Sequence, residues 1–231
     1  MFLTKAPATV NRYLATLRHA YNLAVTDWEW ANKTPMARIM LREPRGRDRH
    51  LDDDEIAALL DAARNNQHPH LYPMVLLALT TGARRGEITS LKSSNLDLKS
   101  RRAVLRDTKN SDKRTLALIP KVVEELKKLK KVRRIDSGLV FENPNFGRRT
   151  YQSIESAWRT ARARANLEDF RFHDLRYTFA SRMAMDGRSL AEIAAALWHR
   201  TLAMVQRYAH LTDAHVHAAI EQTATKVLGD G

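Results

Sequence analysis

The sequence predicts a mainly helical α+β fold with a small antiparallel three-stranded sheet, preceded by a short helical segment. Apolar residues recur at steps of three and four along most of the chain, which is the period of amphipathic helices. Between residues 95 and 119 this period gives way to three short Leu- and Val-rich segments separated by polar turns, a pattern typical of antiparallel strands. The segment Arg42–His50 combines four arginines with proline and glycine, so we expect domains at residues 1–46 and 47–231.

The composition limits the class of protein. The chain has 231 residues, of which 44% are hydrophobic, enough for one sizeable domain and a smaller piece. It has no cysteine, which excludes disulfides and thiolate metal sites. The longest apolar run, Met74–Leu79, is far too short to span a bilayer, and the N-terminus has no apolar stretch of signal-peptide length. We therefore expect a cytoplasmic protein without a membrane partner.

The first domain is predicted to contain one amphipathic helix, from Ala8 to Trp28. Thr9 or Asn11 near its start is a candidate cap. The helix ends before Pro35, because the residue that precedes a proline disfavours helix. The apolar positions follow steps of three and four: Val10, Tyr13, Leu14, Leu17, Tyr21, Ala24 and Trp28.

The second domain opens on the acidic run Asp52–Glu55. Negative charge favours the first turn of a helix, where the helix dipole attracts it. The run is also the only tight carboxylate cluster, and capping explains it better than metal ligation, so we expect no metal. A buried helix from Leu71, a turn at Gly82 and a second short helix follow.

The remainder of the chain supplies the sheet and more helices. The predicted strands are "NLDL", "RAVLR" and "RTLALI". Pro120 then starts a helix with one apolar and one basic face. Further helical segments start near Tyr151, His173, Ser189 and Thr201, and a tail begins at Asp213.

The net charge of +13 predicts a polyanionic partner, most often nucleic acid. The excess is uneven: residues 101–150 contain 15 Lys and Arg against 6 Asp and Glu, whereas residues 51–100 contain 5 against 7. The alternative is a lysine-rich face that is only solvated. The clustering of the charge favours DNA or RNA binding.

Chemistry on a phosphodiester needs cations at the phosphate oxygens, a nucleophile, and a proton donor for the leaving oxygen. Arg84 follows the glycine turn, and His173 and Arg176 lie three apart, on one helical face. His199 lies nine residues before Tyr208. Singly, each has an ordinary explanation, such as a surface arginine, a structural histidine or a packed tyrosine. Their order and spacing together are specific.

This order resembles that of the tyrosine recombinases, the phage-integrase family. The strings "TTGARRGEITSLK", "HDLRYTFAS" and "LAMVQRYAHL" look like the family's motif blocks, and the match runs roughly from Leu51 to Leu211. The resemblance implies an integrase-type catalytic domain that cleaves and rejoins DNA as a site-specific recombinase, without metal, cofactor or ATP. Type IB topoisomerases share the chemistry, but the strings and the short chain fit integrases better.

The resemblance also implies catalytic roles. Arg84 and Arg176 would clamp the scissile phosphate, and His173 and His199 would assist by hydrogen bonding and proton transfer. Tyr208 would attack the phosphate, form a 3′-phosphotyrosyl link and release a 5′-hydroxyl.

The family's general acid is a lysine on a hairpin of the small sheet. Here Lys109 lies at that turn, directly after the strand "RAVLRDT", and Lys113 is the nearby competitor. Glu87, three residues after Arg84, would brace the site.

Two features depart from the family's pattern. The family usually has Leu-Gly-His where this chain has Leu197-Trp198-His199. A tryptophan is far larger than the glycine that allows close packing, so the packing there is expected to be disturbed. Residues 1–46 resemble only the C-terminal part of the family's core-binding domain, so we expect a partial DNA-binding domain that lacks the earlier helices.

Partners and location also follow from the resemblance. It implies double-stranded DNA, a homo-tetramer on paired DNA sites, and accessory DNA-bending proteins as further candidates. The location would be a prokaryotic cytoplasm, at the nucleoid when bound. The alternative function is a truncated, catalytically impaired DNA-binding remnant of an integrase, which would bind DNA without forming a covalent adduct.

Overall fold

In the 231-residue chain, the computed structural model describes residues 5–36, 39–44, 47–106, 113–132, 138–142, 150–199 and 201–228. The chain divides into two compact units, Met1–Asp48 and Arg49–Gly231. The division falls within the basic segment Arg42–His50. The interpretation of residues 1–46 as part of a DNA-binding domain stays a prediction.

The first unit contains α1 (Pro7–Thr26), close to the predicted helix. Pro7 stands in the first turn, where a missing N–H is tolerated, and no side chain caps the helix. The predicted caps are therefore wrong. Thr9 lies inside the helix, and Asn11 instead bonds the backbone of Leu41 in both directions, at 2.8 Å each.

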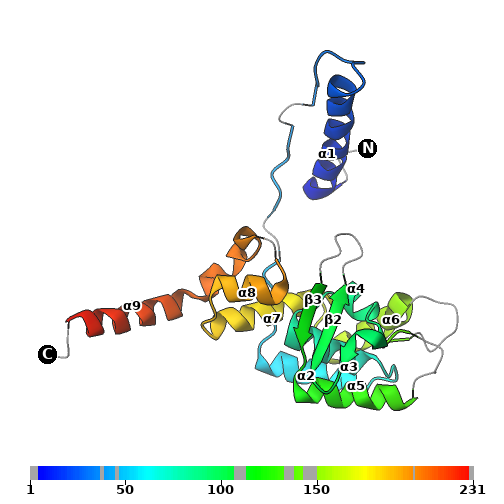
Figure 1. The fold of residues 1–231 in the computed structure, drawn as a ribbon, viewed down its shortest axis with the longest axis vertical. Helices are drawn as coiled ribbons and strands as arrows, with labels where there is room; N and C mark the ends of the chain where they lie inside the picture. The colour runs from blue at the N-terminus through cyan, green and yellow to red at the C-terminus, as the bar shows by residue number, and fades with distance from the viewer. Residues whose placement is uncertain are drawn as a thin grey trace. The chain divides into compact units, whose positions relative to one another are not determined.

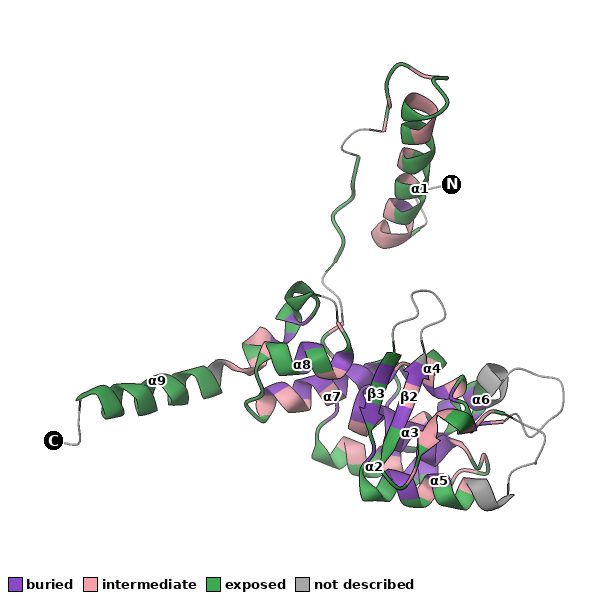
Figure 2. Cartoon of the chain, viewed as in Figure 1, coloured by how far each residue is buried: buried purple, intermediate pink, exposed green. Residues whose placement is uncertain are grey.

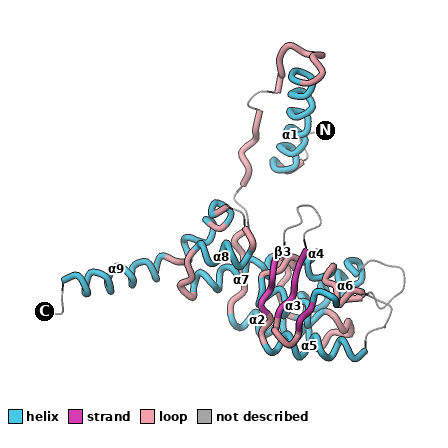
Figure 3. The backbone as a smooth tube through the Cα atoms, viewed as in Figure 1, coloured by secondary structure: helices cyan, strands magenta, loops and turns pink. Residues whose placement is uncertain are grey.

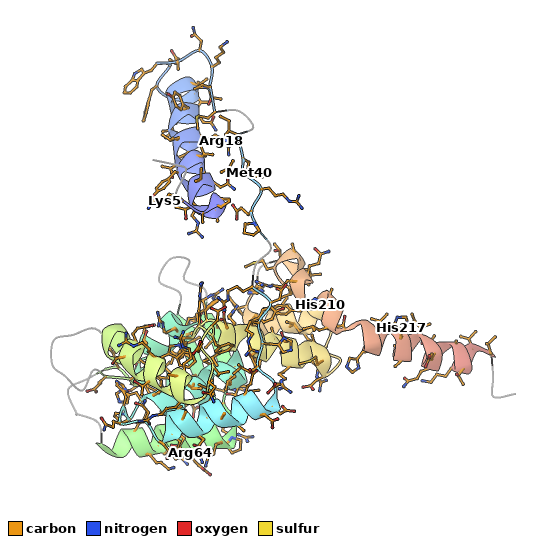
Figure 4. All side chains as sticks on the ribbon, turned by 180° about the vertical axis from the view of Figure 1, so that it is seen from behind. Lys5, Arg18, Met40, Arg64, His210 and His217 are labelled. Atoms are coloured by element: carbon orange, nitrogen blue, oxygen red, sulfur yellow. The ribbon has the colours of Figure 1, made fainter. Side chains whose placement is uncertain are left out.

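The segment after α1 returns along the helix. Arg18 donates to the carbonyl oxygens of Met36 and Ile39 at 3.3 and 2.8 Å, and Figure 4 shows Arg18 and Met40 in this unit. Val10 is buried. Four large apolar residues of the predicted stripe are nevertheless exposed: Tyr13, Leu17, Tyr21 and Trp28.

The second unit places helices around a small sheet (Figure 1). Its described α-helices are α2 (Asp53–Arg64), α3 (Leu71–Thr81), α4 (Arg85–Thr89), α5 (Pro120–Val132), α6 (Thr150–Arg164), α7 (Asp174–Met185), α8 (Leu190–Leu197) and α9 (Asp213–Leu228). The 3₁₀ helices are η2 (Ser93–Asn95), η3 (Leu202–Met204) and η4 (Gln206–Leu211). The strands pair antiparallel in the order β1-β2-β3: β1 (Leu96–Asp97), β2 (Arg102–Arg106) and β3 (Lys113–Ala117). Figure 3 draws the strands in magenta among the helices of this unit. The predicted α+β class with a three-stranded sheet is confirmed.

The acidic run before α2 caps that helix. Asp52 accepts a hydrogen bond from the Glu55 backbone N–H at 2.8 Å, and Glu55 accepts one from the Asp52 backbone N–H at 3.1 Å. Each side chain thus satisfies a donor that a helix start leaves unpaired. Arg49 adds an ion pair to Glu55. The capping interpretation of Asp52–Glu55 is confirmed.

The main core gathers around α3, which is buried along most of its length (Figure 2). Helices α2, α5, α6 and α7 pack against it, and the sheet adds Ala103, Leu105 and Leu116. The strand register pairs Ala103 with Leu116 and Leu105 with Arg114. Because side chains alternate along a strand, Arg114 lies in the same inward-facing phase as Leu116.

A second, smaller apolar cluster joins α7, α8 and η4. The segment from Thr201 to Leu211, predicted as one helix, forms two short 3₁₀ helices instead. The Tyr208 backbone N–H bonds the carbonyl of Val205, three residues earlier, at 2.9 Å. Residues three apart lie in line on a 3₁₀ helix, so Val205 and Tyr208 both enter the cluster, and both are buried.

Gly82 lets three helices meet. It ends α3 in the left-handed conformation, with a φ of 62°, which glycine adopts without the steric cost of a Cβ. A Cβ at this position would lie 2.6 Å from Cδ1 of Phe179 on α7 and 2.7 Å from Cδ2 of Leu197 on α8. The close approach of α3, α7 and α8 therefore requires glycine.

Gly82→Ala should destabilise the protein by roughly 2–4 kcal/mol, because left-handed strain and overpacking combine. Urea unfolding followed by far-UV circular dichroism measures the loss. Gly86→Ala is the matched control: nothing lies within 4 Å of its added Cβ, and alanine favours a helix by up to about 1 kcal/mol. Equal stability of the two variants would contradict the role of Gly82.

The last helix, α9, exposes the side chains described along it, among them Val216, Ile220, Val227 and Leu228 (Figure 2). Neither α9 nor another helix in the described parts of the chain is long and apolar enough to cross a membrane.

Candidate active site

Arg84 stands at the turn between α3 and α4, where its backbone is extended, with a φ of −71° and a ψ of 148°. The carboxylate of Glu87 accepts from the Arg84 backbone N–H at 2.8 Å and from its Nη1 at 2.8 Å. The structure therefore shows the brace that the sequence predicts. The Arg84 side chain keeps 43% of its surface exposed, so its guanidinium is open to a ligand.

Arg176 lies on α7 and is only 5% exposed. Its guanidinium donates to the carbonyl oxygens of Gly82 at 2.6 Å and Leu197 at 2.5 Å, and its Nη2 lies 2.9 Å from Nε2 of His199. Gly82 and Leu197 stand at the ends of α3 and α8. Helix C-termini carry unpaired carbonyls and partial negative charge, so two helix ends hold this buried cation in place.

A third arginine, Arg114 on β3, binds neighbouring carbonyls of the same two helix ends. It donates to Thr81 at 3.0 Å and to Ala196 at 2.6 Å, and it forms an ion pair with Glu87 at 3.1 Å. Arg114 is also 5% exposed. Arg114 and Arg176 thus bridge α3 and α8 through consecutive residues.

Arg114 is a site residue that sequence reasoning missed. The available signal was its phase in the strand, because Arg114, Leu116 and Leu118 are buried and the residues between them are exposed. An arginine in the inward-facing phase of a strand needs acceptors for its charge. Two of those acceptors are backbone carbonyls. Every residue carries one, so the residue types in the sequence do not reveal them as partners.

His199 follows α8 and is oriented by Arg176. A guanidinium only donates hydrogen bonds, so Nε2 of His199 accepts and the neutral ring carries its proton on Nδ1. Burial lowers the pKa of His199 to about 4, and the positive charges of Arg176 and Arg84 add to this effect. The imidazole of His199 is therefore neutral at pH 7.

His173 immediately precedes α7 and is exposed. Partial desolvation lowers the pKa of its imidazole, and the positive charge of Arg176 lowers that pKa further. Both effects favour the neutral ring, which is the form that accepts a proton.

Tyr208 packs its ring into the second apolar cluster and is 4% exposed. Its ring centroid lies 5.0 Å from that of Tyr177, with 37° between the ring planes. The guanidinium of Arg207 lies over the ring of Tyr177, 4.8 Å from the ring centroid. The tyrosine at the centre of "VQRYAHL" is thus held by its ring.

The charges around Arg176 show which side chains share its surroundings. Burial, together with the positive charges of Arg84 and Arg114, lowers the pKa of Arg176 to about 10. Glu87 and Tyr208 act in the opposite direction. Tyr208 therefore lies within the electrostatic reach of the buried arginine.

The structure gathers most of the predicted catalytic set at one place. Arg176 and His199 are in direct contact, and Arg84, His173 and Tyr208 lie within electrostatic reach of Arg176. Lys109 lies outside the described residues. Its competitor Lys113 begins β3 with an exposed side chain and pairs with Arg106. In the described ranges, no group of three or more His, Asp or Glu is arranged to hold a metal ion.

Trp198 ends α8 in the left-handed conformation, with a φ of 56° and a ψ of 45°. Its side chain is 47% exposed, so the large indole finds room at the surface. The difficulty lies in the backbone instead, because a Cβ in the left-handed region costs about 1–2 kcal/mol. Glycine, frequent at helix ends of this kind, avoids that cost.

We expect Trp198→Gly to be about 1 kcal/mol more stable than Trp198→Ala. Both variants lose the indole, and only alanine keeps a Cβ on the left-handed backbone. Ala195→Gly, at an exposed position inside α8, is the opposite control and should lose about 1 kcal/mol. Thermal unfolding measures all three. An alanine variant of Trp198 at least as stable as the glycine variant would contradict the backbone explanation.

Two curated relatives cover most of this chain. A shufflon-specific DNA recombinase of Escherichia coli is 33% identical over 207 residues, which are 88% of this chain and 51% of the relative. The integrase of Haemophilus phage HP1 is 29% identical over 216 residues, which are 93% of this chain and 59% of the relative. The chain thus spans between about half and three fifths of the length of these relatives.

Solved structures show the same fold. The catalytic domain of bacteriophage HP1 integrase has a TM-score of 0.58 and 27% identity, over 74% of this chain and 93% of that one. The Tn1549 transposon integrase in complex with circular-intermediate DNA has a TM-score of 0.74 and 20% identity, over 94% of this chain and 80% of that one. A family model described as the phage integrase family matches residues 49–215. With this match over most of its length, and with the integrase catalytic fold, the chain belongs to the phage integrase family.

Proposed function

We propose that the chain is a site-specific DNA recombinase that cleaves one strand of duplex DNA through Tyr208. The phenolic oxygen of Tyr208 bonds to phosphorus while the bond from phosphorus to the 5′-oxygen breaks, which leaves a 3′-phosphotyrosyl link. The phenol proton passes to the neutral imidazole of His173, and Lys109 donates a proton to the leaving 5′-oxygen. Attack by a 5′-hydroxyl reverses the step, so rejoining needs no ATP.

The observation that carries this proposal is the pair of arginines Arg84 and Arg176, with Tyr208 within electrostatic reach of Arg176. Arg84 is braced yet open to a ligand, and Arg176 is fixed between two helix ends. A guanidinium is a permanent cation that binds two phosphate oxygens at once, and charge builds on those oxygens in the transition state. Burial is the main cause of the lowered pKa of Arg176, and the positive charges of Arg84 and Arg114 lower it further; these two neighbouring cations support anion binding.

His199 has a supporting part in this proposal. Its neutral ring accepts from Arg176 and so fixes the plane of the guanidinium that meets the phosphate. A histidine with a pKa of about 4 is a poor proton donor at pH 7. We therefore give proton transfer to His173 and Lys109.

The proposed substrate is a pair of duplex DNA sites held by a homo-tetramer of this chain. The net charge of +13 supports a polyanionic partner. Each cleavage leaves one 3′-phosphotyrosine and one 5′-hydroxyl. When both DNA sites are cleaved, the 5′-hydroxyl of one site can attack the phosphotyrosine of the other, which is the step that strand exchange requires.

A nicked suicide substrate tests the proposal. A nick close to the scissile phosphate lets the short 5′-hydroxyl fragment diffuse away, so the covalent intermediate accumulates. We expect a protein–DNA adduct on duplexes drawn from a randomised pool, seen by denaturing electrophoresis, and a nucleotide on the peptide that contains Tyr208. Binding to DNA without any adduct would overturn the proposal and favour the catalytically impaired remnant.

Lys109→Ala should slow adduct formation by about 100-fold or more on ordinary DNA, which is the scale of general acid catalysis. A 5′-phosphorothiolate substrate should restore most of the rate, because a thiolate leaves without a proton. Lys113→Ala is the matched control, and we expect it to cleave both substrates at the rate of the unaltered chain. Equal loss of rate by Lys109→Ala on both substrates would move the role to Lys113 or His173.

A further inference from the structure

We propose that Arg114 is a positioning residue, which sets the orientation of Arg84 and Arg176 relative to one another. The inference rests on the proposed function, in which these two guanidinium groups hold the scissile phosphate. It extends that function to a buried residue on β3 that acts through other groups and need not touch DNA.

The first contact of Arg114 reaches Arg84 through one carboxylate. Oε2 of Glu87 accepts from Nη1 of Arg114 at 3.1 Å, and Oε1 of the same carboxylate accepts from Nη1 of Arg84 at 2.8 Å. A carboxylate that is bonded at both oxygens keeps its plane. Without Arg114, Glu87 would keep only its bonds to the backbone N–H and Nη1 of Arg84, and the Arg84 guanidinium would lose its connection to β3.

The remaining contacts of Arg114 hold the two helix ends that position Arg176. Nη2 of Arg114 donates to the carbonyls of Thr81 at 3.0 Å and Ala196 at 2.6 Å. The next residue at each helix end supplies a carbonyl to Arg176. Arg114 thus sets the separation of the ends of α3 and α8. The position of Arg176 depends on that separation, because its guanidinium bonds the same two ends.

Stability alone does not account for an arginine at this place. Burial of a charge is unfavourable unless bonds compensate it, and an apolar side chain of similar volume is often as good or better for stability. Desolvation lowers the pKa of Arg114, so its surroundings disfavour the charge. A residue like Leu116, in the same inward-facing phase, would fill the core without that penalty. What the guanidinium adds is directed bonds to α3, α4 and α8.

The place of Arg114 in the strand adds a connection to the proposed general acid. Arg114 pairs with Leu105, and the next rung pairs Arg106 with Lys113. Lys109 lies in the sequence between those two residues. Through Arg114, β3, which follows Lys109 in the sequence, is therefore bonded to Glu87 and to the ends of α3 and α8.

Arg114→Met is the informative change, because methionine keeps a long apolar stem and removes the donors. We expect DNA affinity to stay within about threefold, while the rate constant of adduct formation at saturating suicide substrate falls about 100-fold, since small misplacements of reacting groups cost rate on that scale. Arg114→Lys keeps a charge without the planar fork and should lie between. Each rate is divided by the folded fraction, taken from urea unfolding at the assay temperature.

Arg182→Met is the matched control. Arg182 also ties two elements together, through the carbonyl of Leu51 at 3.1 Å and the carboxylate of Asp53 at 2.7 Å, but it has no contact with the arginines of the site among the bonds described. Its loss should lower the unfolding midpoint and leave the rate per folded molecule unchanged.

A double-mutant cycle separates positioning from general destabilisation. Glu87→Gln breaks the same connection to Arg84, so its effect on the rate and that of Arg114→Met should not add. Strictly additive effects, or a rate equal to that of the unaltered chain in Arg114→Met and Arg114→Lys, overturn the inference and leave the proposed function standing. No adduct with the unaltered chain overturns the proposed function, and the inference with it.

Discussion

Tyr208→Phe should leave DNA affinity unchanged and reduce the covalent adduct below detection. The substitution removes one oxygen and keeps the ring, which makes the packing contacts with Tyr177 and the second cluster. Because phenylalanine has no atom that can bond to phosphorus, the chemistry stops while the fold persists. Adduct formation on the nicked substrate and binding in a gel-shift assay measure the two quantities separately.

Tyr177→Phe is the matched control for this prediction. The two rings lie 5.0 Å apart in one cluster, so the same oxygen is removed from the neighbouring position. We expect Tyr177→Phe to form the adduct. An adduct that persists in Tyr208→Phe, or that maps to Tyr177, would show that the nucleophile has been wrongly assigned.

Arg176→Lys should reduce the rate of adduct formation by about 10²- to 10³-fold, the scale of losing one group that stabilises transition-state charge. A single ammonium cannot reproduce the fork that meets Gly82, Leu197 and His199. The surroundings that lower the pKa of Arg176 to about 10 would also act on lysine, whose ordinary pKa is about 10.4. The replacement would lose its proton closer to neutral pH, whereas the native guanidinium keeps its charge.

The pH profile distinguishes this cause from misfolding. The remaining activity of Arg176→Lys should fall as pH rises above neutrality, relative to that of the unaltered chain, because the uncharged lysine no longer attracts phosphate. Arg182→Lys, on the same helix α7 but bonded to Leu51 and Asp53, should keep the rate and the profile of the unaltered chain. A profile of Arg176→Lys parallel to that of the unaltered chain would contradict the charge argument.

Most elements of the second unit could be predicted because their signals are local. The apolar run of α3, the left-handed turn at Gly82 and the short Leu- and Val-rich strands each follow from neighbouring residues. The segment Thr201–Leu211 shows the limit. The three-residue spacing of Val205 and Tyr208 fits an α-helix and a 3₁₀ helix equally, and packing against α7 and α8 decides between them.

The residues of the site also fall into those that the sequence could reveal and those that it could not. The order of Arg84, Arg176 and Tyr208 could be read as a chemical set, because each residue type has a recognisable task at a phosphate. Arg114 could not be read in this way, because its partners include backbone carbonyls of two helices that are far away in the sequence. The backbone strain at Trp198 was also hidden, since a large residue suggests a problem of volume.

Three guanidinium groups, those of Arg84, Arg114 and Arg176, crowd the ends of two helices, and two of them share the carboxylate of Glu87. Without DNA, this arrangement keeps like charges close together, and the helix ends and one carboxylate only partly neutralise them. In the proposed function, a bound phosphate would supply the missing negative charge. Because any species that binds only the native state stabilises it, substrate binding and folding would be thermodynamically linked at this point. The nucleic acid would then complete the electrostatic balance of the protein that cuts it.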